Sequence, residues 1–329
     1  MLRIVLKALA PAILVAAALS SSALVAKAGG YPDRPIHLIV SYPAGGATDL
    51  IGRLFAEALG DKLGQRVIVD NRGGASGMLG ARFAAESKPD GYTLIIATAT
   101  THAVNPWLFK NTIGYDAIKD FTPISYVGFT PLVLVAHPSV PASNVKEMLA
   151  YIKSKNGNIS YANGGTGSVP HMAGELFNAT AGIKVQTVPY KGDGPATTDV
   201  LGGHLPYMFA HLPVVLPLIR SGQLKAIGVT TRQRSEFAPD IPTIAEQGLP
   251  NYSIETWWGV FGPAKMPKDI VATLNTAVRD ILTKPEVKKM FFDRGYETKP
   301  TTPEEFGAFV KSEYDRWGKI VETSGMQIN

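Results

Sequence analysis

The chain has 329 residues, of which 45% are hydrophobic and 18% are charged, and it contains no cysteine. This composition excludes a disordered segment and allows a sizeable core, so the length favours two domains. The missing cysteine excludes thiolate zinc sites, iron–sulfur clusters, disulfide scaffolds and cysteine nucleophiles. The formal net charge of +5 taken alone points towards nucleic acid or an anionic surface.

The first 28 residues have the layout of a secretory signal peptide. Arg3 and Lys7 form a basic start, an apolar run covers 8–19, and a small-x-small triplet ends at Ala28. This order is typical of a cleaved export signal, and the apolar run is short for a membrane anchor. We therefore predict an exported chain that is cleaved after Ala28. Cleavage removes three of the 32 basic residues and leaves 29 against 27 acidic ones, so the mature net charge falls to +2.

The first part of the mature chain alternates short apolar runs with segments of helical period. In chain order we predict a strand, a helix, a strand, a helix and a strand at 36–40, 51–59, 67–69, from 78 onwards and 93–97. A run of strands and helices in this order implies a parallel sheet covered by helices.

A second set of strands and helices follows. We predict strands at 124–127 and 132–135, a helix at 145–152, and strands at 159–162, 185–188, 207–209 and 224–229 with helices between them. The tail is mostly helical, with apolar stripes over 270–282 and 306–320, and 302–305 reads as a capping box. Two such sets predict an α/β protein with two lobes. We place lobe 1 at 31–130 plus 235–329 and lobe 2 at 131–234.

Four glycine-rich turns are the best candidates for a binding site. They cover 43–49, 71–77, 163–168 and 190–195, and each lies between a predicted strand and a predicted helix. Ligands of open α/β sheets bind beyond the carboxyl ends of the strands, and free N–H groups at a helix start attract anions. Two turns fall in each lobe, so a small anion could be held from both sides. Ordinary turns between strands and helices use the same residues, and this alternative stays open for each turn.

The other chemistry-bearing residues form no recognisable catalytic motif. There is no phosphate-binding loop, no nucleophile elbow, and no pair of histidines at metal-ligand spacing, so we expect no catalytic residue, cofactor or metal. The basic residues form no stripe interleaved with aromatics, so nucleic acid is not an expected partner. Asp49 and His171 each have two interpretations, as a ligand contact or as a support for the loop. Ser168 is a candidate helix N-cap, and Trp257 and Trp258 are expected to pack between elements.

Several segments together resemble the Bug/TctC family of periplasmic solute receptors, which serve tripartite tricarboxylate transporters. These segments are 31–36, 40–49, 69–77, 89–94, 165–171, 188–192 and 242–248. The resemblance covers essentially the whole mature chain in order. It implies a type II periplasmic-binding-protein fold, in which two α/β lobes close on a ligand in the cleft between them.

The resemblance also implies the residues that hold a carboxylate through backbone N–H groups and hydroxyls. On one lobe these are Ala44, Gly45, Gly46, Thr48 and Asp49, on the other Thr166, Gly167, Ser168 and His171, with Thr98 and Thr100 at the rim. One departure concerns the strand at 207–209, after which the family often has aspartate where this chain has Ala210. Its absence weakens the case for an amino-acid ligand, although the neighbouring His211 is a possible replacement.

We therefore expect a monomeric periplasmic receptor for a small organic carboxylate or dicarboxylate, with the membrane subunits of a tripartite tricarboxylate-type transporter as partners, and no enzymatic activity. A sensory receptor that presents the same ligand to a membrane signalling kinase is the main alternative. An exported hydrolase is a weaker one, because no nucleophile–base pair is recognisable. An enzyme similar to porphobilinogen deaminase would need a cysteine to carry its cofactor.

Overall fold

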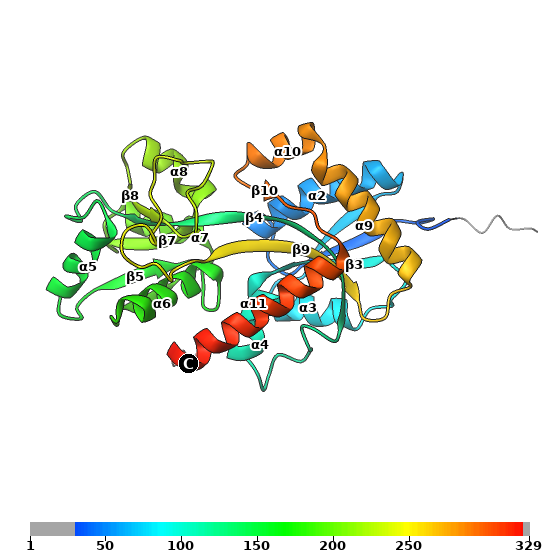
Figure 1. Ribbon diagram of the computed structural model, residues 1–329, viewed down its shortest axis with the longest axis horizontal. Helices are drawn as coiled ribbons and strands as arrows, with labels where there is room; N and C mark the ends of the chain where they lie inside the picture. Colours follow the sequence, from blue (N-terminus) through cyan, green and yellow to red (C-terminus); the bar gives the residue numbers. More distant parts are fainter. Residues whose placement is uncertain (1–29, 325–329) are drawn as a thin grey trace, which may run out of the picture.

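The structure is a computed structural model that describes residues 30–324. The predicted signal segment lies outside these residues. The described chain forms two lobes, each with a sheet flanked by helices, and two long strands run from one lobe into the other (Figure 1). Within 30–324 no helix combines the length and the apolar character needed to cross a membrane.

The first lobe begins with the predicted parallel sheet. Strand β1 (Ile36–Val40) lies between β2 (Val67–Asn71) and β3 (Thr93–Thr98). Helices α2 (Ala47–Leu63) and α3 (Met78–Ala85) connect these strands, and the short segment η2 (Ala75–Gly77) leads into α3. The short segments η3 (Thr100–Val104) and α4 (Asn105–Leu108) follow β3. Successive residues of β1 enter two different cores, as expected for a strand covered on both faces. The predicted order of strands and helices is confirmed.

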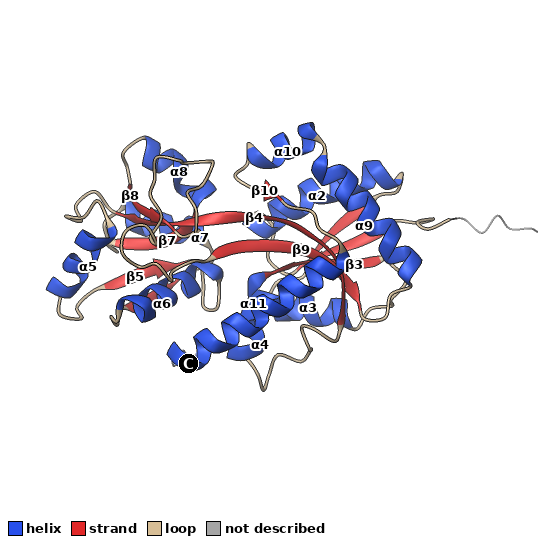
Figure 2. Cartoon of the chain, viewed as in Figure 1, coloured by secondary structure: helices blue, strands red, loops and turns tan. Residues whose placement is uncertain are grey.

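The two strands predicted around Thr130 and Pro131 are in fact one strand, β4 (Phe121–Ala136). It pairs with β9 (Glu255–Pro263) as far as Pro131 and with β7 (Tyr207–His211) from Leu132 onwards. The proline therefore lies where the strand changes partner, where a missing N–H interrupts a ladder least. Strand β9 is absent from the sequence prediction, and with β4 it joins the two lobes (Figure 2).

The second lobe is built on the other half of β4. Strand β7 pairs with it, β5 (Ser160–Asn163) joins β7 to β6 (Gln186–Pro189), and β8 (Lys225–Val229) also pairs with β4. The helices of this lobe are α5 (Val145–Ser154), α6 (Val169–Ala181), α7 (Asp193–Leu201) and α8 (Leu212–Arg220). These elements match the predicted second set, and α8 is an apolar helix that contains Pro213 and Pro217.

The chain then returns to the first lobe. The returning elements are α9 (Lys268–Thr283), α10 (Pro285–Phe292), β10 (Glu297–Thr298), which pairs with β4, and α11 (Pro303–Ser324). The predicted capping box is confirmed, because the Thr302 N–H donates to Glu305 Oε2 at 2.9 Å and the Glu305 N–H donates to Thr302 Oγ1 at 3.2 Å. The apolar stripe of α9 packs in the same core as Ile36 and Leu38.

The segment between β8 and β9 packs on the second lobe. Phe237 and Ile241 share a core with Val133 of β4, and the Tyr252 hydroxyl donates to the Ala173 carbonyl at 3.0 Å. The predicted lobe boundaries remain a prediction, and these contacts favour a second crossing just before β9 rather than at 234.

Candidate functional site

Four loops follow strand ends and precede helices, as the sequence predicts. We name them loop A (43–46), loop B (72–77), loop C (164–168) and loop D (190–192). Loops A and B are tied together, because Asn71 Nδ2, just before loop B, donates to the carbonyl of Tyr42, just before loop A, at 3.1 Å. Loops C and D are tied together by the Gly192 N–H, which donates to the Gly164 carbonyl at 3.1 Å. Each lobe thus presents one joined pair of loops.

A hydrogen bond connects the two pairs across the lobes. The Ser76 hydroxyl of loop B donates to the Thr166 carbonyl of loop C at 3.1 Å. Ala75 and Ser76 have φ values of 47° and 53°, a left-handed backbone that costs energy for residues other than glycine. Asn105 Nδ2 holds this unusual turn by donating to the Ser76 carbonyl at 2.9 Å. The turn therefore aims the Ser76 side chain at the opposite lobe.

Trp258 of β9 holds the start of α2 within the first lobe. It is fully buried, as expected for a packing residue, and its indole N–H donates to Thr48 Oγ1 at 3.0 Å. Its ring packs edge-on against Tyr296 with 5.4 Å between centroids. Tyr296 in turn donates from its hydroxyl to the Ala47 carbonyl at 3.3 Å. The start of α2 is thereby fixed to a strand that joins the lobes.

Asp193 and His211 form a largely buried pair behind loop D. His211 Nδ1 lies 2.6 Å from Asp193 Oδ2, its backbone N–H donates to the same oxygen at 3.0 Å, and its Nε2 lies 3.0 Å from Thr256 Oγ1. Burial raises the pKa of Asp193, but the charge and hydrogen bonds of His211 outweigh it and hold that pKa below its ordinary value. Sequence reasoning missed Asp193, although an acid at a helix start after a glycine was a visible signal.

Asp49 makes contacts that stay within its own lobe. Its Oδ2 accepts the Gly45 N–H at 2.9 Å, and its Oδ1 accepts Asn71 Nδ2 at 2.9 Å and lies 2.9 Å from Arg53 Nη2. Burial raises the pKa of Asp49, yet these donors together lower it below its usual range. Of the two roles predicted for Asp49, the contacts favour support of loop A.

His171 plays the corresponding part for loop C. Its Nδ1 accepts the Gly167 N–H at 3.0 Å, and its own backbone N–H donates to Ser168 Oγ at 3.3 Å. Ser168 is thus the N-cap of α6, as predicted. Burial lowers the pKa of His171 to about 4, so the ring is neutral at pH 7. Because Nδ1 accepts a hydrogen bond, the ring proton lies on Nε2, 3.9 Å from Glu175 Oε1. These contacts favour loop support for His171 as well.

The internal contacts show which donors are left for a ligand. The N–H groups of Gly45 and Gly167 are already used. The first N–H groups of a helix have no intrahelical acceptor, and within 30–324 no internal acceptor faces those of Gly46, Ala47, Thr48 and Val169. The hydroxyl oxygens of Thr48 and Ser168 accept N–H groups, so their protons remain available. Two helix starts from two lobes therefore offer donors that suit an anion.

The remaining predicted residues lie around this arrangement. Ala44 and Thr166 are exposed at the tips of loops A and C. Thr98 and Thr100 are each 3% exposed, and Thr98 Oγ1 lies 3.2 Å from the Tyr42 hydroxyl. Both threonines are thus buried, with Thr98 beside Tyr42, and their place at the rim of the site stays a prediction.

Comparison with known proteins finds the family that the sequence resembles. The model of the tripartite tricarboxylate transporter family receptor, TctC, matches residues 51–326. The protein BugT of Bordetella pertussis is 35% identical over 298 residues, which cover 91% of each chain.

Solved structures extend the likeness to the fold. Rpa4515 of R. palustris, solved with adipate, is 34% identical with a TM-score of 0.83, and the match covers 90% of this chain and 99% of that one. MatC of Rhodopseudomonas palustris, solved with bound malate, is 32% identical with a TM-score of 0.80, over 88% of this chain and all of that one. The architecture is that of two-lobed periplasmic binding proteins, as the sequence predicts.

Proposed function

This chain belongs to the tripartite tricarboxylate transporter receptor family of solute-binding proteins, and from this premise we propose that it binds a small dicarboxylate between its lobes. The observation that carries the proposal is the pair of helix starts, α2 and α6, with unused N–H groups and hydroxyl protons on opposite lobes. Adipate and malate, the ligands of two similar structures, both carry two carboxylates. One carboxylate at each helix start satisfies both sets of donors.

The charged groups near these helix starts agree with an anionic ligand rather than an amino acid. Asp49 is paired with Arg53, and Asp193 is paired with His211, so neither carboxylate is left for a ligand amine. Ala210, at the end of β7, supplies none either. An ammonium group on the ligand would therefore lack a counter-charge.

The proposed cycle is closure of the lobes on the ligand, with β4 and β9 as the connection that bends. We place the first crossing at Pro131, where β4 changes partner, and the second just before Glu255, where β9 begins. In the proposed role the mature protein, cleaved after Ala28, is a periplasmic monomer without enzymatic activity. It delivers its ligand to transporter subunits in the membrane.

Loss of ligand uptake in a deletion strain would separate this transport role from presentation of the ligand to a signalling kinase.

Calorimetric titration of the mature protein with mono-, di- and tricarboxylates and with amino acids tests the ligand class. We expect saturable binding of a C4 to C6 dicarboxylate and none of the matching amino acids. A protein that binds amino acids but none of the carboxylates would contradict the proposal.

Ser76→Ala tests whether the bond between loops B and C favours the closed form. A single hydrogen bond contributes about 0.5–1.5 kcal/mol, so we expect dicarboxylate affinity to fall roughly two- to tenfold. Small-angle scattering of the unliganded variant should show a larger radius of gyration. Ser87→Ala is the matched control, because the Ser87 hydroxyl donates to the Phe83 carbonyl of its own lobe. Equal behaviour of the two variants would remove the role assigned to Ser76.

A further inference from the structure

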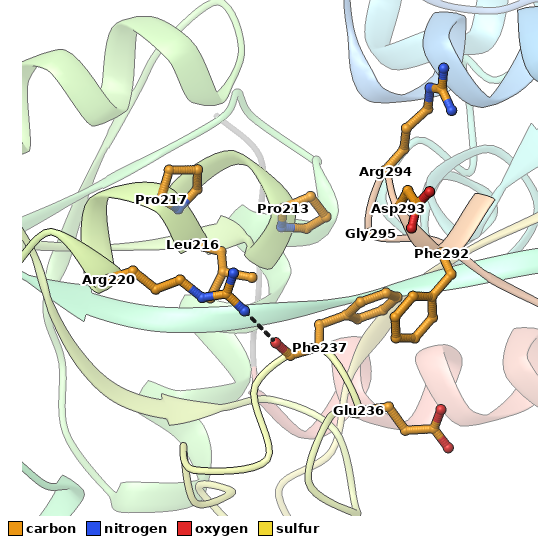
Figure 3. Close-up of a pocket in the computed structure, with 10 residues that line it drawn as sticks. All are labelled: Pro213, Leu216, Pro217, Arg220, Glu236, Phe237, Phe292, Asp293, Arg294 and Gly295. Carbon is orange, nitrogen blue, oxygen red and sulfur yellow. Dashed lines mark hydrogen bonds between the residues drawn. The ribbon is translucent and has the colours of Figure 1, made fainter. Parts of the chain in front are cut away.

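A pocket of about 440 Å³ lies apart from loops A to D, between α8 and the end of α10 (Figure 3). Its walls come from both lobes. Leu216 and Arg220 belong to α8, and Phe237 packs in the same core as that helix. Phe292 and Gly295 come from the end of α10 and the turn after it, on the first lobe. An occupant of this pocket would therefore touch both lobes at once.

Part of the pocket wall is apolar. The rings of Phe237 and Phe292 lie with their centroids 4.4 Å apart at 32° to each other. Phe292 is nevertheless 39% exposed, so this ring pair is incompletely covered. Leu216 and Pro213 continue the apolar surface. Such a surface suits the aromatic or branched apolar body of a small molecule.

Arg220 adds a cation to the pocket, next to Phe237. Arg220 donates from Nη2 to the Phe237 carbonyl at 3.3 Å, and within 30–324 no carboxylate lies within ion-pair distance of it. The two acids that line the pocket do not neutralise the charge of Arg220. Asp293 pairs with Lys289 at 2.8 Å, and the Glu236 carboxylate points away from the pocket (Figure 3). A guanidinium beside aromatic rings suits a carboxylate attached to an apolar body.

The pocket also adjoins the connection between the lobes. The Gly295 carbonyl accepts the Thr130 hydroxyl at 2.7 Å, and Thr130 precedes the point where β4 changes partner. Gly295 has φ +82°, and a Cβ there would lie 2.1 Å from Pro213 Cγ, so the two lobes meet closely at this glycine. A change in lobe angle must alter this contact and the shape of the pocket.

We propose that this pocket is a second binding site, for a small carboxylate with an aromatic or branched apolar body, and that its occupancy is coupled to ligand affinity at loops A and C. The coupling rests on the proposed function, whereas binding in the pocket does not. Two sites on one two-state hinge influence each other reciprocally when both ligands bind the two lobe angles with different affinities.

Titration of the mature protein with phenylacetate, followed by calorimetry and by NMR, tests the pocket. We expect saturable binding that Arg220→Met weakens at least about tenfold, since a hydrogen bond to a charged group contributes about 1.5–3 kcal/mol. Arg220→Lys keeps the charge and should retain part of the affinity. Arg279→Met, which removes an arginine of α9 outside the pocket lining, and Ser168→Ala in loop C should leave phenylacetate binding unchanged. The assignment of a binding site to this pocket would be wrong if phenylacetate showed no saturable binding. It would also be wrong if Ser168→Ala lost phenylacetate binding while Arg220→Met kept it.

Adipate titrations with and without saturating phenylacetate test the coupling. We expect the adipate affinity to change at least about fivefold, the lower range of coupling between sites. An unchanged affinity would overturn the coupling. Phenylacetate binding through Arg220, in a protein that binds no dicarboxylate through loops A and C, would support the pocket while contradicting the proposed function.

Discussion

Replacing Asp193 with alanine should lower the free energy of unfolding by about 3 kcal/mol, the lower end of the range for a broken buried ion pair. The side chains of Asp193 and His211 are only 9% and 14% exposed, so little water can replace the lost contacts. His211 would keep Thr256 as a partner but lose its carboxylate. Urea unfolding at pH 7 measures the effect.

Asp315→Ala is the control, because Asp315 forms an exposed pair with Lys311 that contributes about 0.2–1 kcal/mol. Asp193→Asn should recover part of the loss, since an amide oxygen can still accept from the His211 ring. Because the pKa of Asp193 is lowered in the folded protein, its contribution is present above the ordinary value of about 3.9 and is lost as the pH falls below it. Equal stability of the Asp193 and Asp315 variants would contradict the assigned pair.

Ser168→Ala should weaken dicarboxylate binding by about 1.5–3 kcal/mol, the contribution of a hydrogen bond to a charged group. This corresponds to a loss of roughly 10- to 150-fold in affinity. The reason is geometric, because Ser168 Oγ already accepts the His171 N–H and its own proton is left to donate. Isothermal calorimetry with adipate measures the change.

The same substitution removes a helix cap, which costs about 1 kcal/mol of stability. Asn144→Ala separates the two effects, because Asn144 caps α5 of the same lobe by accepting the Glu147 N–H at 2.9 Å. We expect that variant to lose similar stability and to keep its affinity. An unchanged affinity in Ser168→Ala would remove Ser168 from the site.

Local signals explain why most of the fold could be predicted. Apolar periodicity located β1, α2 and α9, and the polar pairs at helix starts located the caps at Ser168 and Thr302. The continuous strand β4 could not be predicted, because its passage through Pro131 depends on a change of partner. Strand β9 also depends on distant partners, since it pairs with β3 and β4.

The candidate site was predictable to the level of its loops but not of its donors. The glycine turns show where backbone can approach a ligand. Whether a given N–H is free depends on side chains elsewhere, and Asp49 takes the Gly45 N–H while His171 takes that of Gly167. The contact of Trp258 with Thr48 joins residues 210 positions apart, which no local pattern reveals.

A crystal structure of the mature protein with adipate tests the central claim most directly. We predict one carboxylate within about 3 Å of the N–H groups of Gly46 to Thr48, and the other at the Val169 N–H and the Ser168 hydroxyl. Adipate held by side chains away from both helix starts, or lying only beside Arg220, would contradict the claim that the two helix starts form the binding site.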